Sequence, residues 1–268
     1  MTSANPNDPV RIAADLGITL HDVVPGRTTP AEGLDEALAE LAAHHAATVA
    51  VARSGRFDEA VPMQVQLYAD CVGLLGTDHP DSVSLLATLG AMLTEAKRLD
   101  EAVAVLETSL ADQLRIHGEE DPRTFDSRDS LAYALRDAER HEEAAEVYEA
   151  DLAIRLRALG EGHPTTFACR EALAVTLLRA GRRDEAVELY RVNLDAMTEH
   201  LGADDDETLT ARNELANALA GSRSFGEAIA LHEENLAART RAFGSGHDGV
   251  EVTRANLAAI RAEAAGDA

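Results

Sequence analysis

The chain has 268 residues and a formal net charge of −24, with 46% hydrophobic residues but only 3% aromatic residues. Such an acidic excess excludes nucleic acid and anionic membrane surfaces as expected partners, because both require a basic protein surface. An aliphatic, alanine-rich composition with few aromatic residues favours an all-α fold. No apolar run approaches the length of about 18 residues that a membrane-spanning helix needs.

Residues 1–31 differ in composition from the rest of the chain. Two clusters of residues that break helices and strands, residues 5–9 and 25–30, flank a stretch from Val10 to Leu20 that fits one short helix or strand. We therefore expect residues 1–31 to form a mostly flexible N-terminal arm. The alternative is that this arm packs on the structure that follows it.

From residue 34 onward the sequence repeats itself every 42 residues without insertion or deletion. The glycines that close the copies are Gly76, Gly118, Gly160, Gly202 and Gly244. A fixed period between 20 and 50 residues is typical of a solenoid. The predicted repeats are residues 34–76, 77–118, 119–160, 161–202 and 203–244, and residues 248–265 supply one further helix that caps the last repeat.

Each copy reads as two helices joined by a short turn. In the fourth copy, Leu173, Ala174 and Leu177 lie on one face of a first helix that Pro164 opens. Gly181 is placed to end this first helix, and Gly202 is placed to end the second one. The copy is therefore predicted to be a helix hairpin.

The fourth copy also carries the pattern L-A-x₆-G-R-x-x-E-A-x-x-L-Y, preceded by G-x-x-H-P in residues 160–164. This pattern resembles the tetratricopeptide repeat, and its length is similar to the 42-residue variant of kinesin light chains. The resemblance covers residues 38 to about 265. It implies an all-α, right-handed α-solenoid of about five helix pairs with a C-terminal capping helix in the solenoid region, residues 32–268.

The resemblance implies a non-catalytic scaffold that binds a partner's peptide or helix in a concave groove lined by the first helices. The residues expected to line this groove are Asp126, Asp129, Tyr133, Arg136, Glu171, Val175, Arg179, Thr210, Asn213 and Asn217. Because acids dominate, we expect a partner that is neutral to basic. The alternatives are a sensor of a small molecule or signal peptide, and a catalytic or accessory subunit of a biosynthetic complex; a homo-oligomer is compatible with all three.

The sequence indicates no catalytic residues, no metal site and no cofactor. His79, His163 and His247 recur at the starts of first helices, too far apart to share one metal ion, so we interpret them as residues that help cap the helices. Cys71 and Cys169 provide no disulfide framework, which favours a reduced, cytoplasmic location. The abundance of alanine and arginine suggests a bacterial coding sequence.

A row of arginines occupies one position in the repeats, three residues before the leucine of the first helix. Its members are Arg128, Arg170, Arg212 and Arg254, and the polar residues 19 positions before them are Ser109, Asp151, Asn193 and Asn235. A buried guanidinium needs hydrogen-bond partners. We therefore expect each arginine to bond the polar residue on the preceding second helix; the alternative is an arginine row that lines a ligand groove.

Overall fold

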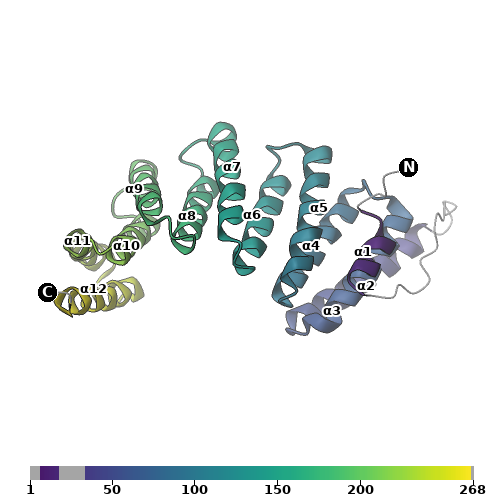
Figure 1. The fold of residues 1–268 in the computed structure, drawn as a ribbon, viewed down its shortest axis with the longest axis horizontal. Coiled ribbons are helices and arrows are strands. Elements are labelled where there is room, and N and C mark those ends of the chain that lie inside the picture. Colours follow the sequence, from purple (N-terminus) through teal and green to yellow (C-terminus); the bar gives the residue numbers. More distant parts are fainter. Residues whose placement is uncertain (1–6, 18–33, 267–268) are drawn as a thin grey trace. The chain divides into compact units, whose positions relative to one another are not determined.

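The computed structural model describes residues 7–17 and 34–266, and within them all regular structure is α-helical (Figure 1). These residues fall into two compact units, one up to Val147 and one from Tyr148 onward. The first unit contains α1 (Pro9–Asp15), α2 (Leu34–Arg53), α3 (Phe57–Leu75), α4 (Pro80–Glu95), α5 (Leu99–His117) and α6 (Pro122–Asp137), and α7 (His141–Leu159) crosses the boundary. The second contains α8 (Pro164–Arg179), α9 (Arg183–His200), α10 (Asp206–Gly221), α11 (Phe225–Phe243) and α12 (Asp248–Gly266).

Helices that follow one another in sequence pack as pairs, such as α2 with α3, α4 with α5, α8 with α9 and α10 with α11. First helices begin where a side chain accepts a hydrogen bond from the backbone two residues on. His79 Nδ1 accepts from Asp81 N at 3.2 Å, and His163 Nδ1 accepts from Thr165 N at 3.3 Å. The interpretation of these histidines as capping residues is therefore confirmed.

The turn between the helices of each pair requires a residue in the left-handed region. Gly181 ends α8 with φ of 82°, as its position in the sequence predicts. The equivalent position in other repeats is occupied by Lys97, Glu139 and Arg223, with φ of 59°, 60° and 62°. Residues with a side chain are strained in this region. At these three turns, the packing of the repeat therefore outweighs the backbone preference of the residue.

Second helices begin with a recurring arginine–glutamate contact. Arg140 Nε donates to Glu143 at 2.7 Å, and Arg182 Nε donates to Glu185 at 2.7 Å, three residues further along the helix. Each contact holds the arginine beside the acidic first turn, whose negative charge complements the helix dipole. The contact therefore stabilises the same turn in consecutive repeats.

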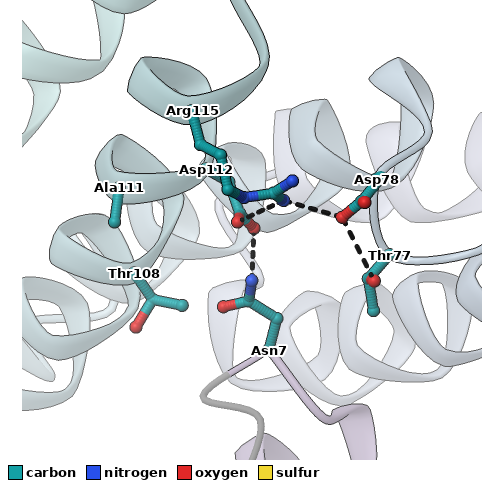
Figure 2. Close-up of a pocket in the computed structure, with 7 residues that line it drawn as sticks. All are labelled: Asn7, Thr77, Asp78, Thr108, Ala111, Asp112 and Arg115. Atoms are coloured by element: carbon teal, nitrogen blue, oxygen red, sulfur yellow. Dashed lines mark hydrogen bonds and ion pairs between the residues drawn. The ribbon is translucent and has the colours of Figure 1, made fainter.

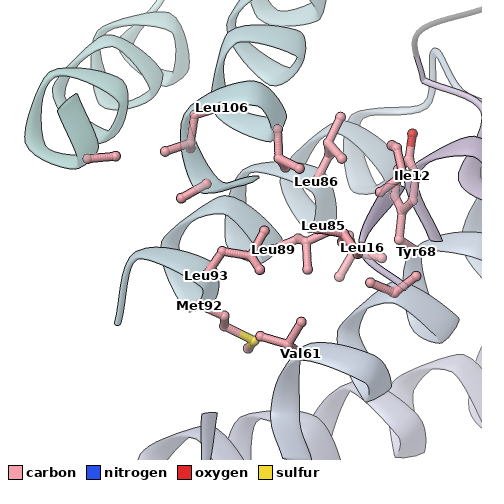
Figure 3. Packing of buried hydrophobic residues seen from close by; sticks show 14 of the residues in the cluster. Ile12, Leu16, Val61, Tyr68, Leu85, Leu86, Leu89, Met92, Leu93 and Leu106 are labelled. Carbon is pink, nitrogen blue, oxygen red and sulfur yellow. The ribbon is translucent and has the colours of Figure 1, made fainter. Parts of the chain in front are cut away.

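Each unit has its own apolar core. In the first unit, Val61 and Tyr68 of α3 meet Leu86 and Leu89 of α4 and Leu106 of α5 (Figure 3). In the second unit, Tyr190, Leu215 and Leu219 form a cluster to which Ile260 of α12 contributes. The helix that follows the last repeat is thus packed against it, as a capping element requires.

The N-terminal segment differs from the expectation of a mostly flexible arm. Residues 9–15 form α1, which packs against α3 (Figure 1), and the side chains of Ile12, Ala13 and Leu16 are buried. The spacing of these apolar residues gives α1 one buried face, which the alternative interpretation allowed. Residues 1–6 and 18–31 of the predicted arm lie outside the described residues.

Candidate functional site

In the first unit, the exposed face of the first helices is built by α4 and α6, which pack beside each other. On α6, Asp126 is exposed, Asp129 is half-buried, and 39% of Tyr133 is accessible. The Arg136 guanidinium lies 5.1 Å from the centroid of the Tyr133 ring, in a cation–π contact. The expected groove residues of this repeat therefore share one accessible face.

This face is joined between consecutive repeats by an ion pair. Lys97, which follows α4, donates from Nζ to Asp137 of α6 at 2.8 Å. Asp137 raises the pKa of Lys97 by accepting this hydrogen bond. One acid of the face is thus paired with a lysine, while Asp126 on the same face is an exposed carboxylate.

In the second unit, the corresponding face of α8 carries Glu171, Val175 and Arg179, of which Glu171 and Arg179 are exposed and Val175 is half-buried. Burial, followed by the charge of Glu171, raises the pKa of Glu214 on α10 to about 7. Glu214 is therefore partly protonated at neutral pH.

Glu214 was not among the residues expected from the sequence. It stands directly before Leu215, at a position where other repeats carry Thr88, Ser130, Ala172 and Asn256. The sequence does place an acid beside the buried apolar face of this first helix, which could have marked Glu214 as a candidate site residue. In a chain with 48 acidic residues, one further acid does not stand out.

The two asparagines expected in the groove of the fifth repeat have different environments. Asn213 is only 7% exposed, and its Nδ2 donates to Thr253 of α12 at 2.9 Å. Its Oδ1 accepts from Asn235 Nδ2 at 2.7 Å. Asn213 therefore belongs to the interior rather than the groove, because polar side chains of α11 and α12 use its amide. Asn217 is exposed.

Between these asparagines lies His232, which is fully buried on α11. Its Nδ1 is 3.1 Å from Asn213 Oδ1, and its Nε2 is 3.1 Å from Asn217 Oδ1. Because Asn213 Oδ1 already accepts from Asn235, it is an acceptor, and the ring proton is assigned to Nδ1. Burial lowers the pKa of His232, which favours the neutral ring. With the proton on Nδ1, a hydrogen bond at Nε2 requires the Asn217 amide to present its nitrogen in place of Oδ1.

Thr210 is also occupied by contacts within the protein. It is exposed on α10, but its Oγ1 donates to the backbone oxygen of Asp206 at 2.8 Å and accepts from Arg239 Nη2 at 2.7 Å. Arg239 comes from α11 and is only 3% exposed. Fewer polar side chains of the fifth repeat are therefore available on the groove face than the sequence suggests. Those that remain are Asn217 and Glu214.

The arginine row is buried at three of its four positions. Arg128, Arg170 and Arg212 are 6%, 2% and 8% exposed, whereas Arg254 is exposed and pairs with Glu251. The buried members exclude the alternative of an arginine row open to a groove at those positions. Burial lowers the pKa of Arg170.

The expected partner of Arg170 is wrong. Arg170 Nη1 donates to Asn193 Oδ1 at 3.3 Å, on the second helix of its own repeat, and not to Asp151. Asp151 accepts instead from Arg155 Nε at 2.6 Å. In an antiparallel helix pair, the first helix lies directly against the second helix of the same repeat. The polar group nearest to Arg170 therefore comes from the helix that follows it in the sequence, and not from the helix before it.

Other members of the polar set also have partners that the spacing did not predict. Arg128 Nη1 donates to the backbone oxygen of Glu119 at 3.0 Å, and Asn235 Nδ2 donates to that of Leu209 at 2.7 Å. Ser109 is buried, and within the described part of the chain its Oγ has no hydrogen-bond partner. The row is therefore a set of individual internal contacts.

Among residues 7–17 and 34–266, no group of three or more histidine, cysteine, aspartate or glutamate side chains is arranged to hold a metal ion. None of the helices in these residues is sufficiently long and apolar to cross a bilayer.

Comparison with protein families identifies a repeat model over most of the chain. Models described as tetratricopeptide repeat match residues 38–115, 84–150, 123–199 and 208–248. A search of curated proteins finds no match.

Solved structures of similar fold include two of kinesin light chain-like, nearly identical TPR-like repeats from Podosopora anserina. They are 27% and 26% identical to this chain, cover 75% and 76% of it and 95% and 97% of their own length, and superpose with TM-scores of 0.68 and 0.69. BtubC from P. vanneervenii is similar in fold, with 20% identity over 86% of this chain and 85% of its own, and a TM-score of 0.57.

Proposed function

Because the chain belongs to the tetratricopeptide repeat family, whose members generally bind protein partners and are generally non-catalytic, we propose that it is a scaffold for protein–protein interaction. In this proposal, the exposed face of the first helices binds an extended segment or a helix of a partner. Tyr133 and Arg136 offer an aromatic and cationic contact in the first unit, and Val175 and Asn217 offer apolar and amide contacts in the second.

The observation that carries the proposal is the carboxyl pair of Glu171 and Glu214. These groups come from first helices of neighbouring repeats, and the Glu171 carboxylate contributes to the raised pKa of Glu214. A lysine or arginine of a partner placed beside them takes the place of the proton on Glu214 and offsets one of the two negative charges. We therefore propose that the partner segment is neutral to basic, in agreement with the net charge of −24.

The proposal is tested by selecting random peptides on the wild-type chain and measuring their affinity for a double variant, Glu171→Lys with Glu214→Lys. We expect the selected peptides to contain lysine or arginine and to lose at least about tenfold in affinity for the variant, because the reversed charges repel them. Their affinity for the wild-type chain should decrease as ionic strength rises.

The matched control carries the same charge change on the second helix α9, as Glu188→Lys with Glu199→Lys, at two exposed positions. It should bind the peptides nearly as the wild type does. Because Glu214 must release its proton, affinity for a basic peptide should rise with pH through about 7. Selection of acidic peptides, or equal losses in both double variants, would contradict the proposal.

A further inference from the structure

A second surface of the first unit holds a helix, and it is distinct from the face of the first helices. Asn7, directly before α1, donates from Nδ2 to Asp112 Oδ2 of α5 at 2.5 Å (Figure 2). At the other end, Arg98 at the start of α5 donates to the backbone oxygen of Leu16 at 2.9 Å. Because Asn7 meets the later residue of α5 and Leu16 the earlier one, α1 runs antiparallel to α5.

The second helix α3 forms the other side of this surface. The Tyr68 hydroxyl donates to the backbone oxygen of Asn7 at 2.9 Å, and the Tyr68 side chain is 1% exposed. Ile12 and Leu16 belong to the same apolar cluster as Tyr68 (Figure 3). We name the surface of α3 and α5 that α1 covers, with Tyr68, Arg98 and Asp112, the α1 groove.

The bound helix is short and does not fill the groove. With seven residues, α1 is too short to be stable in isolation, so its helical form depends on docking. A cavity of about 430 Å³ remains at its start, lined by Asn7, Thr77, Asp78, Thr108, Asp112 and Arg115 (Figure 2). A second cavity, of about 270 Å³, lies along Ile12 and Leu16 and extends to Asp100 and Val105 of α5. The groove therefore has room for a bulkier occupant.

The charges of α1 do not complement the groove. Asp15 and Arg11 of α1 line the second cavity together with Asp100 and Glu101 of α5, so three acids and one guanidinium of this lining surround it. Arg98 is already bound to Glu101, and Arg11 is 3.6 Å from Asp15. In the first cavity, one guanidinium, that of Arg115, is shared by the carboxylates of Asp78 and Asp112. Like charges near each other weaken docking.

We propose that the α1 groove is a second protein-docking site and that α1 occupies it until a partner helix replaces α1. The partner segment is a short amphipathic helix with aliphatic side chains at the spacing of Ile12 and Leu16. In place of Asp15 it carries lysine or arginine, which pairs with Asp100 and Glu101. Its terminal carbonyl group accepts the hydrogen bond of Arg98, as the carbonyl group of Leu16 does.

The test uses the full chain and, as probe, a blocked peptide of residues 7–17 with the change Asp15→Arg. Replacing Ile12 by serine in the chain weakens α1 as an internal competitor, so this chain should bind the probe at least about tenfold more tightly than the wild type. The change Asp15→Arg in the chain should strengthen α1 docking, raise the melting temperature and weaken probe binding by about tenfold.

Two controls separate docking from unspecific effects. Val10 lies on the outer side of α1, where 57% of it is exposed, so Val10→Ser in the chain should leave probe binding unchanged. A probe that also carries Ile12→Asp should not bind. If circular dichroism shows that the Ile12→Ser chain is unfolded, the Asp15→Arg chain decides, since Asp15 is exposed.

Equal binding of the probe to the wild-type, Ile12→Ser and Asp15→Arg chains would overturn the proposal, as would undiminished binding of the Ile12→Asp probe. Light scattering after size exclusion supplies a further outcome. A wild-type dimer that Ile12→Ser converts into monomers would assign the groove to α1 of a second copy of this chain and would overturn the partner-helix proposal.

Discussion

Buried polar side chains differ from repeat to repeat, and Arg170 shows how one of them is matched to a particular neighbour. Arg170 is bound by Asn193, and Asn193 Nδ2 donates in turn to the backbone oxygen of Phe167 at 3.4 Å. The pair therefore joins α8 to α9 at two points. A charged group that is 2% exposed leaves little tolerance for the loss of its partner.

The change Arg170→Ala should lower the free energy of unfolding by about 1 to 3 kcal/mol, because Asn193 loses a buried hydrogen bond. Urea unfolding of Arg170→Ala, Asn193→Ala and the double variant gives the coupling between the two residues. A coupling near zero would mean that the contact contributes nothing. Arg254→Ala, at the exposed member of the row, is the matched control and should have a small effect.

His232 should make the stability of the second unit dependent on acidity. Its pKa is lowered in the folded state by burial, so its contribution is present above the unfolded pKa of about 6.5 and is lost as pH falls. His232→Gln introduces the residue that Gln64 provides at the same repeat position and does not titrate. Between pH 7.5 and 5.5, on the order of one unit either side of that pKa, the wild type should therefore lose more stability than this variant.

Melting temperatures of both chains across this pH range provide the measurement. His44→Gln is the control, because His44 is an exposed histidine on α2. Its pH profile should follow that of the wild type. A His232→Gln chain with the same acid sensitivity as the wild type would contradict the assignment of a neutral ring.

At the scale of helix elements, packing between the two helices of a pair depends on a matched small and large residue. In the second repeat, a Cβ atom built on Gly90 of α4 would lie 2.4 Å from Cγ of Leu106 on α5. In the fourth repeat the same two positions hold Ala174 and Tyr190, both buried in one cluster. A branched leucine thus faces glycine, whereas a flat ring accommodates alanine.

Gly90→Ala should therefore destabilise the chain by about 1 to 3 kcal/mol through overpacking, although alanine favours a helix by about 1 kcal/mol over glycine. Adding Leu106→Tyr recreates the pair of the fourth repeat and should recover part of the loss in thermal unfolding. Gly221→Ala is the control, because no atom lies within 4 Å of a Cβ built there. A stabilising Gly90→Ala would show that α5 yields without cost.

The helix α1 changes what truncation should do. From the sequence alone, removal of residues 1–31 should leave the repeats intact, because the repeats do not include these residues. In the structure, its loss would expose Tyr68 and remove Asn7 from the buried Asp112 carboxylate. Truncation is therefore expected to destabilise the first unit, because the buried Asp112 carboxylate would lose the Asn7 amide and keep Arg115.

At the scale of the whole molecule, a solenoid buries each repeat against its neighbour, and the C-terminal end of the second unit needs a last cover. α12 provides it through Val250, Leu257 and Ile260, which are buried, and through Thr253, which contacts Asn213. Ending the chain at Gly244 should expose the apolar side of α10 and α11 and cause aggregation.

Size exclusion and turbidity during heating measure this effect. Val252→Glu, at a residue of α12 that is 53% exposed, is the control and should remain soluble. A truncated chain that is as soluble as the full chain and melts at the same temperature would contradict the capping role of α12.

The sequence by itself determined the all-α class, the helix pairs and the capping histidines, because those features depend on residues within a few positions of each other. Because the sequence repeats every 42 residues, the same local features predict the same helix pair in each copy. Gly181 illustrates this, since its place between two apolar runs is sufficient to predict the turn.

Only the tertiary structure decided which side chains meet. Asn7 and Asp112 are 105 positions apart, and no periodicity relates them. The raised pKa of Glu214 likewise depends on Glu171 of a neighbouring first helix, and the burial of Asn213 depends on side chains that α11 and α12 supply. The physical reason is that spacing determines which face of a helix a residue occupies, whereas its partner is determined by the neighbouring helices that cover that face.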